Sequence, residues 1–250
     1  MKFNEVVKIV GNVPHMTKVQ GKAIYKMVLE SSIKNILELG FAHGTSTCYM
    51  AAALEEKKEG KIITIDKLSA KQRNPNIYQL IASTGFSDYI EPIFGFGSYN
   101  WELMRIIEKQ TKNGICKPIF DFCFLDGSHN FEIDCCAFFL LDKLLNPGAY
   151  ILLDDLLWTY NHVKDTELVK RMSIDELTTP HIKKLFDLII TQHQDYTDFS
   201  IDQGWAMARK KLNTIIHNEA SVKLKDLYSE TSIYTDLKKI ARKLRSKILM

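Results

Sequence analysis

A glycine motif, Glu38-x-Gly40-x-x-x-Gly44, follows a short apolar run over Ile36–Leu39 and precedes a helical pattern. Glycines at such a turn let the backbone bend sharply and approach a ligand closely. Asp66 ends the next apolar run, where its carboxylate can accept hydrogen bonds from the two hydroxyls of a ribose. The two features together predict a site for a cofactor that contains a nucleoside.

The same loop differs from the motifs that bind phosphate groups. Ala42 stands where a Gly-x-Gly-x-x-Gly motif has its middle glycine, and the sequence contains no Gly-Lys-Ser/Thr phosphate loop. Glu38, two residues before Gly40, would repel a pyrophosphate group. The cationic, phosphate-free S-adenosylmethionine suits an acid at this position better than a dinucleotide does.

Acidic residues also end two later apolar runs. Asp126 begins the segment Asp126-Gly127-Ser128-His129, and Asp154 and Asp155 end the run that starts at Tyr150. The carboxyl ends of parallel strands share one edge of a sheet, so three carboxylates would converge there and repel one another. A hard cation such as Mg²⁺ relieves this repulsion. The sequence therefore predicts a metal site formed by Asp126, Asp154 and Asp155.

His129 lies three residues after Asp126, and the ordinary pKa of histidine, near neutral pH, suits proton transfer. Structural alternatives stay open for each of these residues. Asp126 can be a plain strand-terminal cap, and Asp154 and Asp155 can be solvated turn acids. Ser128-His129-Asn130 also reads as a helix cap. Trp158 and Tyr160, which follow the acidic pair, line either the core or an acceptor pocket.

The elements that would position these residues alternate along the chain. We predict strands over Ile36–Leu39, Lys61–Asp66, Ile90–Gly95, Phe120–Asp126, Tyr150–Asp155, Phe186–Thr191 and Trp205–Lys210. We predict helices over Thr17–Ser31, Ser46–Lys57, Ala70–Thr84, Tyr99–Thr111, Phe131–Leu145 and Thr166–Leu185. This order predicts a doubly wound α/β fold: a mostly parallel seven-stranded sheet with helices on both faces.

The last part of the chain has a different character. The segment Leu237–Ile248 carries six cations and no acid, and its apolar residues share one helical face. Such a basic amphipathic helix either packs on its own domain or binds an anionic membrane surface or a partner through residues 237–250. The net charge of +3 is too small to indicate a nucleic-acid partner. Without an apolar run long enough to cross a membrane, we expect a cytoplasmic protein.

Ile36-Leu-Glu-Leu-Gly-Phe-Ala-His-Gly-Thr-Ser-Thr47 resembles the first motif of class I S-adenosylmethionine-dependent methyltransferases, and Ile62-Ile-Thr-Ile-Asp66 resembles the second. The resemblance is greatest to the small-molecule and sugar O-methyltransferase branch. It implies a Rossmann-like methyltransferase domain over residues 1–211, with a helical lead-in over 1–33 and a helical extension over 212–250. Homodimers are common in this branch.

The resemblance also assigns roles to individual residues. Glu38 and Gly40 would line the amino-acid end of the cofactor, Asp66 its ribose, and Gly97 and Ser98 its adenine. The full set expected around S-adenosylmethionine is Met16, Glu38, Gly40, Gly44, Ser46, Asp66, Gly97, Ser98 and Asp126. In metal-dependent relatives, the strand ends that match Asp126, Asp154 and Asp155 supply the metal ligands. In sugar-modifying relatives, a histidine with the spacing of His129 is the proposed general base.

These features lead to one main interpretation and two alternatives. The main one is cation-assisted transfer of a methyl group to a hydroxyl of a small molecule or sugar, with Asp126 and His129 as catalytic residues. The second keeps the fold and cofactor but uses no metal. The third is a catalytically inactive, cofactor-binding scaffold that is attached to a membrane or partner through its tail.

Overall fold

The computed structural model describes residues 1–163 and 167–212. The strands of the main sheet are β1 (Asn35–Leu39), β2 (Lys61–Lys67), β3 (Ile90–Gly95), β6 (Phe120–Leu125), β7 (Leu145–Leu153), β8 (Tyr196–Asp202) and β9 (Trp205–Lys210). Two short strands, β4 (Thr111–Lys112) and β5 (Ile115–Cys116), form a separate hairpin. The predicted extension lies outside the described residues beyond Leu212, and the basic helix lies wholly outside them.

The α-helices are α1 (Phe3–Val10), α2 (Lys18–Leu29), α3 (Thr45–Lys57), α4 (Ile77–Thr84), α5 (Tyr99–Gln110), α6 (Phe131–Asp142), α7 (Ile174–Thr178) and α8 (His181–Leu185). Short 3-10 turns are η1 (Leu68–Gln72), η2 (Tyr160–His162) and η3 (Val169–Arg171), and a π-helical turn, η4 (Phe186–Ile190), follows α8. No helix among residues 1–163 and 167–212 is both long and apolar enough to cross a membrane.

The sheet has seven strands in the order β3-β2-β1-β6-β7-β9-β8. Neighbouring strands from β3 to β7 are parallel, whereas β9 is antiparallel to both β7 and β8. The chain enters the sheet at its middle strand region with β1, adds β2 and β3 toward one edge, and then returns to place β6 on the other side of β1. The carboxyl ends of β1 and β6 are therefore neighbours at the point where the strand order reverses, which is where ligands bind in such sheets.

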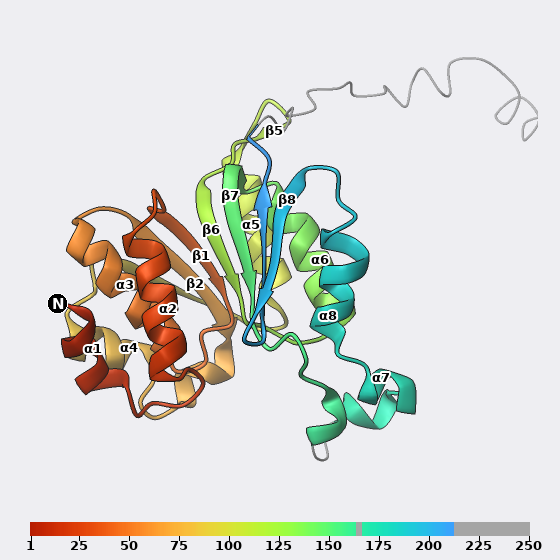
Figure 1. Cartoon of the computed structure of the whole chain (residues 1–250), viewed down its shortest axis with the longest axis horizontal. Coiled ribbons are helices and arrows are strands. Elements are labelled where there is room, and N and C mark those ends of the chain that lie inside the picture. The colour runs from red at the N-terminus through yellow and green to blue at the C-terminus, as the bar shows by residue number, and fades with distance from the viewer. Residues whose placement is uncertain (164–166, 213–250) are drawn as a thin grey trace, which may run out of the picture. The chain divides into compact units, whose positions relative to one another are not determined.

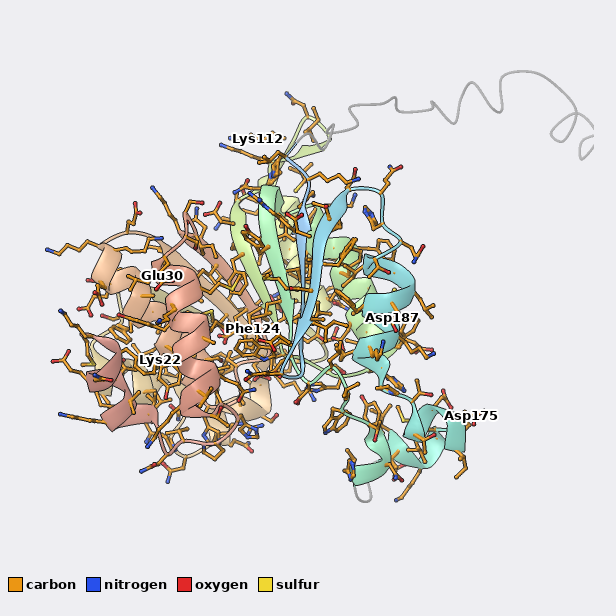
Figure 2. All side chains as sticks on the ribbon, in the orientation of Figure 1. Lys22, Glu30, Lys112, Phe124, Asp175 and Asp187 are labelled. Carbon is orange, nitrogen blue, oxygen red and sulfur yellow. The ribbon has the colours of Figure 1, made fainter. Side chains whose placement is uncertain are left out.

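Helices cover both faces of the sheet, as predicted (Figure 1). One apolar layer combines buried residues of α1 to α4 with side chains from one face of the central strands, and the second combines residues of α5, α6 and α8 with the opposite face. Phe124, which is fully buried on β6, lies in the crowded centre of the molecule in Figure 2. The two layers fix the central strands from both sides.

The prediction of a strand over Phe186–Thr191 was wrong. The structure places this run in η4, which continues α8, and the strand that precedes β9 is Tyr196–Asp202. Phe186 and Ile190 are buried four residues apart, whereas Leu188 between them is 56% exposed. This is the burial pattern of a helix that packs on one side, and a short apolar run does not reveal by itself which period it follows.

Two predicted helices are broken into shorter pieces. The helix expected over Ala70–Thr84 divides into η1 and α4, with Pro75 between them. The side chain of Asn76 accepts a hydrogen bond from the Gln79 amide and so caps the start of α4. The helix expected over Thr166–Leu185 divides among η3, α7 and α8, since Pro180 separates the last two. The segment that carries α7 stands out from the sheet and helices, and Asp175 lies on it (Figure 2).

Candidate active site

The loop after β1 depends on Gly40, which adopts φ 88°. A Cβ atom at this position would lie 1.9 Å from the carbonyl oxygen of Asp126. Only glycine fits so close to a neighbouring backbone. The first glycine of the motif therefore lets the β1 loop pass directly against the loop after β6, and so brings the predicted cofactor loop next to the predicted catalytic residues.

Glu38 makes its contacts within the protein, beneath this loop. Its side chain is fully buried and accepts hydrogen bonds from the hydroxyls of Ser46, Thr47 (2.5 Å) and Thr64 (2.6 Å). Burial raises the pKa of Glu38 to about 7, although the three hydroxyl donors oppose the rise. Glu38 thus ties β1 to the start of α3 and to β2, beneath the glycine loop.

Asp66 holds the same loop from the other side. Its Oδ2 accepts hydrogen bonds from the backbone amides of Phe41 (3.1 Å) and Ala42 (2.7 Å), and its Oδ1 accepts one from the amide of Lys67. Asp66 also lines the cavity that opens over the loop. The residue predicted to bind a ribose is therefore also part of the support of the glycine turn.

A cavity of about 840 Å³ opens where the loops after β1, β2, β3, β6 and β7 meet. The predicted site residues that line it are Met16, Gly40, Asp66, Gly97, Ser98, Asp126, His129, Asp154 and Asp155. Its lining does not include Glu38, Gly44 or Ser46, which lie in and beneath the glycine turn. Contact of these three residues with a cofactor stays a prediction.

Asp126, His129 and Asp155 each place one possible ligand atom within 4.8 Å of the other two. Nε2 of His129 lies 3.2 Å from Oδ2 of Asp155 and 3.5 Å from Oδ1 of Asp126. Neither contact has the geometry of a hydrogen bond, so this buried nitrogen has no hydrogen-bond partner among the described residues. Two carboxylates beside a nitrogen without a partner fit a divalent cation that accepts oxygen and nitrogen ligands.

The charges of these three residues depend on one another. Burial raises the pKa of Asp126 to about 7, and the charges of Asp154 and Asp155 add to this rise. Burial disfavours protonation of His129, but the nearby carboxylates of Asp126 and Asp155 outweigh it and raise the pKa of His129 to about 9. The adjacent imidazole in turn lowers the pKa of Asp155. Without another cation, His129 is therefore protonated at neutral pH.

Asp154 lies on the cavity but outside this group of three. Its Oδ1 accepts hydrogen bonds from Nε1 of Trp205 (2.7 Å) and from the amide of Asp155 (2.7 Å), and burial raises its pKa. The structure thus brings His129 into the predicted metal group and gives Asp154 a structural contact. Metal ligation by Asp154 stays a prediction.

Two tyrosines hold the turn that carries His129. The Ser128 amide donates to the hydroxyl of Tyr99 (3.1 Å), and the hydroxyl of Tyr160 donates to the Ser128 carbonyl oxygen (2.9 Å). Tyr99 in turn donates to Asp134, a fully buried carboxylate. The clamp fixes the peptide next to His129, which adopts φ 55°. Such a backbone conformation is uncommon outside glycine and needs support from its surroundings.

Trp158 packs against His129 itself, with ring centroids 5.1 Å apart, and Tyr160 packs against Trp158 at 4.8 Å. These contacts place Trp158 against the turn that carries His129 and Tyr160 against Trp158. A role in the acceptor pocket stays a prediction for them.

Sequence reasoning missed several residues of this region: His15, Arg73, Tyr99, Asp134 and His181. Tyr99 follows the predicted adenine segment directly, so its position beside the cavity could have been anticipated. His15 and Arg73 are far apart in sequence, and no spacing rule connects them. His181 accepts a hydrogen bond from the Phe131 amide at the start of α6, a contact that depends on the unpredicted break at Pro180.

Comparison with known proteins identifies a methyltransferase domain. The model of a methyltransferase-domain family matches residues 37–156, which include the last three residues of β1, the glycine loop, Asp126, His129 and the acidic pair. No curated protein matches the chain in sequence.

Solved structures share the fold. An O-methyltransferase from Bacillus cereus in complex with SAH has a TM-score of 0.58 at 23% identity, and the match covers 84% of this chain and 90% of that one. A tomaymycin-synthesis O-methyltransferase from Streptomyces achromogenes in complex with SAM has a TM-score of 0.57 at 18% identity, covering 84% and 89%. An SAH-bound methyltransferase from Podospora anserina has a TM-score of 0.60 at 15% identity, covering 84% and 87%.

At these identities the structural likeness shows a shared fold, and the sequence match assigns residues 37–156 to the methyltransferase-domain family. The chain therefore carries a methyltransferase domain on a Rossmann-like fold.

Proposed function

We propose that this protein transfers the methyl group of S-adenosylmethionine to a hydroxyl oxygen of a small molecule or sugar, assisted by a divalent cation. The observation that carries the proposal is a single cavity that joins the glycine loop after β1 to the group of Asp126, His129 and Asp155. Three similar structures are those of methyltransferases that hold SAM or SAH. In this arrangement, a methyl donor bound over the glycine loop would lie beside groups that can ionise a hydroxyl.

In the proposed reaction, the acceptor oxygen attacks the methyl carbon, the C–O bond forms and the C–S bond of the sulfonium breaks. His129 accepts the hydroxyl proton at Nε2, and S-adenosylhomocysteine leaves as a neutral thioether. Asp126 and Asp155 would hold the cation. A bound cation lowers the pKa of a coordinated hydroxyl and fixes its position. The clamp of Tyr99 and Tyr160 keeps His129 in place, because it fixes the adjoining peptide.

His129 also lies close enough to ligate the cation itself, and one nitrogen cannot serve as ligand and base in the same step. The test must therefore separate these two roles.

Two quantities are to be measured in each variant. The first is the affinity for Mn²⁺, by electron paramagnetic resonance, and the second is methyl transfer from labelled S-adenosylmethionine to a panel of catechol and sugar hydroxyls. Asp155→Asn should weaken Mn²⁺ binding by about tenfold or more, because it removes one anionic ligand. His129→Gln should lose turnover while Mn²⁺ affinity changes less than about threefold.

Asp154→Asn is the matched control, since it removes the neighbouring carboxylate, which lies outside the group of three. Equal loss of Mn²⁺ affinity in Asp154→Asn and Asp155→Asn would mean that Asp154 is also a metal ligand. A tenfold loss in His129→Gln would make His129 a ligand instead of a base. Full turnover of the wild-type protein after treatment with EDTA would remove the metal from the proposal.

A further inference from the structure

Arg73 lines the cavity, on the segment that follows η1. Its NH1 lies 3.2 Å from Nε2 of His15, which belongs to the segment that precedes α2 and also lines the cavity. The guanidinium is always charged and has no lone pair to offer. Nε2 of His15 therefore accepts this hydrogen bond and is unprotonated.

His15 is held as a neutral support for Arg73. Its ring stacks on that of His43 with centroids 5.6 Å apart, and Nδ1 of His43 lies 2.6 Å from the carbonyl oxygen of Pro75. Burial lowers the pKa of His15, and the charges of Arg73 and His43 lower it further, against the opposite effects of Asp155 and Asp66. His15 adopts φ 77°, a conformation that the surrounding contacts must maintain. The positive charge at this position is thus that of Arg73.

This charge has no acidic partner within the described part of the chain. Carboxylates lie within 4.0 Å of Arg105 and Arg209, but the structure places none so close to Arg73. Only one of the guanidinium's N–H groups is used by His15. The remaining N–H groups form a planar fork, which matches the two oxygens of a carboxylate or phosphate. Lys67 also lines the cavity and adds a second cation.

We propose that Arg73, oriented by His15, is an oxyanion-binding subsite of the cavity. The inference rests on the proposed function, because that function supplies the two sources of the oxyanion. One source is the carboxylate in the amino-acid portion of the cofactor. The other is a carboxylate or phosphate group of the acceptor. Either source puts the anion in the same cavity as the group of Asp126, His129 and Asp155.

The first arm of the test asks whether the cofactor supplies the anion. Calorimetry compares S-adenosylhomocysteine with 5′-methylthioadenosine, which lacks the amino-acid portion. If Arg73 binds the cofactor carboxylate, Arg73→Gln should weaken binding of S-adenosylhomocysteine by about tenfold or more, the usual effect of losing a charged hydrogen bond. Binding of 5′-methylthioadenosine should change less than about twofold, and Arg73→Lys should restore part of the loss.

The second arm asks whether an acceptor supplies the anion. Sulfate is titrated into the free protein and into the protein loaded with S-adenosylhomocysteine, against chloride at equal ionic strength. The side-chain Nε–H resonance of Arg73 is the readout, assigned by its loss in Arg73→Gln. An acceptor subsite binds sulfate in the loaded protein, whereas a cofactor subsite binds sulfate only in the free protein.

Lys71→Gln is the matched control, because it removes the same charge from the neighbouring segment. The Lys71 ammonium lies 4.6 Å from the ring centroid of Phe94 and does not line the cavity. The proposal is overturned if Arg73→Gln resembles Lys71→Gln in its affinity for S-adenosylhomocysteine and sulfate does not shift the Arg73 resonance. If the wild-type protein fails to bind S-adenosylhomocysteine, the proposed function fails, and the sulfate titration of the free protein still tests Arg73.

Discussion

At the scale of single residues, Glu38 shows that the place of a residue in a sequence motif does not determine which atoms its side chain contacts. Its place two residues before Gly40 suggested a contact with the cofactor, and this argument relied only on charge and spacing. In the structure the carboxylate is fully buried, does not line the cavity and accepts hydrogen bonds from three hydroxyls of two other elements. Sequence spacing fixes which strand carries a residue, but the packing around that strand decides which way the side chain points.

The burial of Glu38 predicts a pH dependence of stability. Its pKa is about 7 in the folded protein and 4.5 in the unfolded chain, so the folded state keeps a proton that the unfolded state releases. The contribution of Glu38 to the free energy of unfolding is therefore greatest below pH 4.5 and is lost as pH rises to 7, by about 3 kcal/mol in total.

Glu38→Gln cannot ionise and should escape this loss. In urea unfolding, the free energy of unfolding of the variant, relative to that of the wild-type protein, should be higher at pH 8 than at pH 5. Glu30→Gln, an exposed position at the C-terminal end of α2, is the charge control (Figure 2). An identical difference in stability between Glu38→Gln and wild type at both pH values would contradict the role assigned to Glu38.

At the scale of elements, the sequence patterns predicted four of the five parallel strands well. The exception is β7, which begins at Leu145 instead of the predicted Tyr150. β1, β2, β3 and β6 lie within one residue of their predicted bounds, because their apolar residues are bounded by Gly, Asp or Lys. The segment between β7 and β9 was predicted poorly, since Phe186–Thr191 is apolar enough for either a strand or a helix. Its identity depends on the apolar layer that Phe186 and Ile190 share with buried residues of α6, which no local pattern records.

The helical assignment of Phe186–Ile190 can be tested by two truncations of similar chemistry. In a strand, positions 188 and 190 would share one face, whereas in the structure Ile190 is fully buried and Leu188 is 56% exposed. Ile190→Ala should lower the free energy of unfolding by about 2–5 kcal/mol. Leu188→Ala should change it by less than about 0.5 kcal/mol. Equal losses in urea unfolding would support the strand.

At the scale of the whole molecule, strand order explains why the site could be predicted in part. The reversal between β1 and β6 brings the ends of strands together, so acids at those ends were expected to converge, and Asp126 and Asp155 do so. Strand order does not specify the contacts within the loops. His15, Arg73 and the tyrosine clamp come from segments whose relative positions depend on the complete packing, and they were therefore missed.

The central claim is that the cavity over the glycine loop binds S-adenosylmethionine. Isothermal titration of the wild-type chain with S-adenosylhomocysteine tests it most directly. We predict binding of one equivalent per chain, weakened at least about tenfold in Asp66→Ala, because that carboxylate both lines the cavity and holds the amides of Phe41 and Ala42. The absence of binding to the folded wild-type protein would contradict the claim.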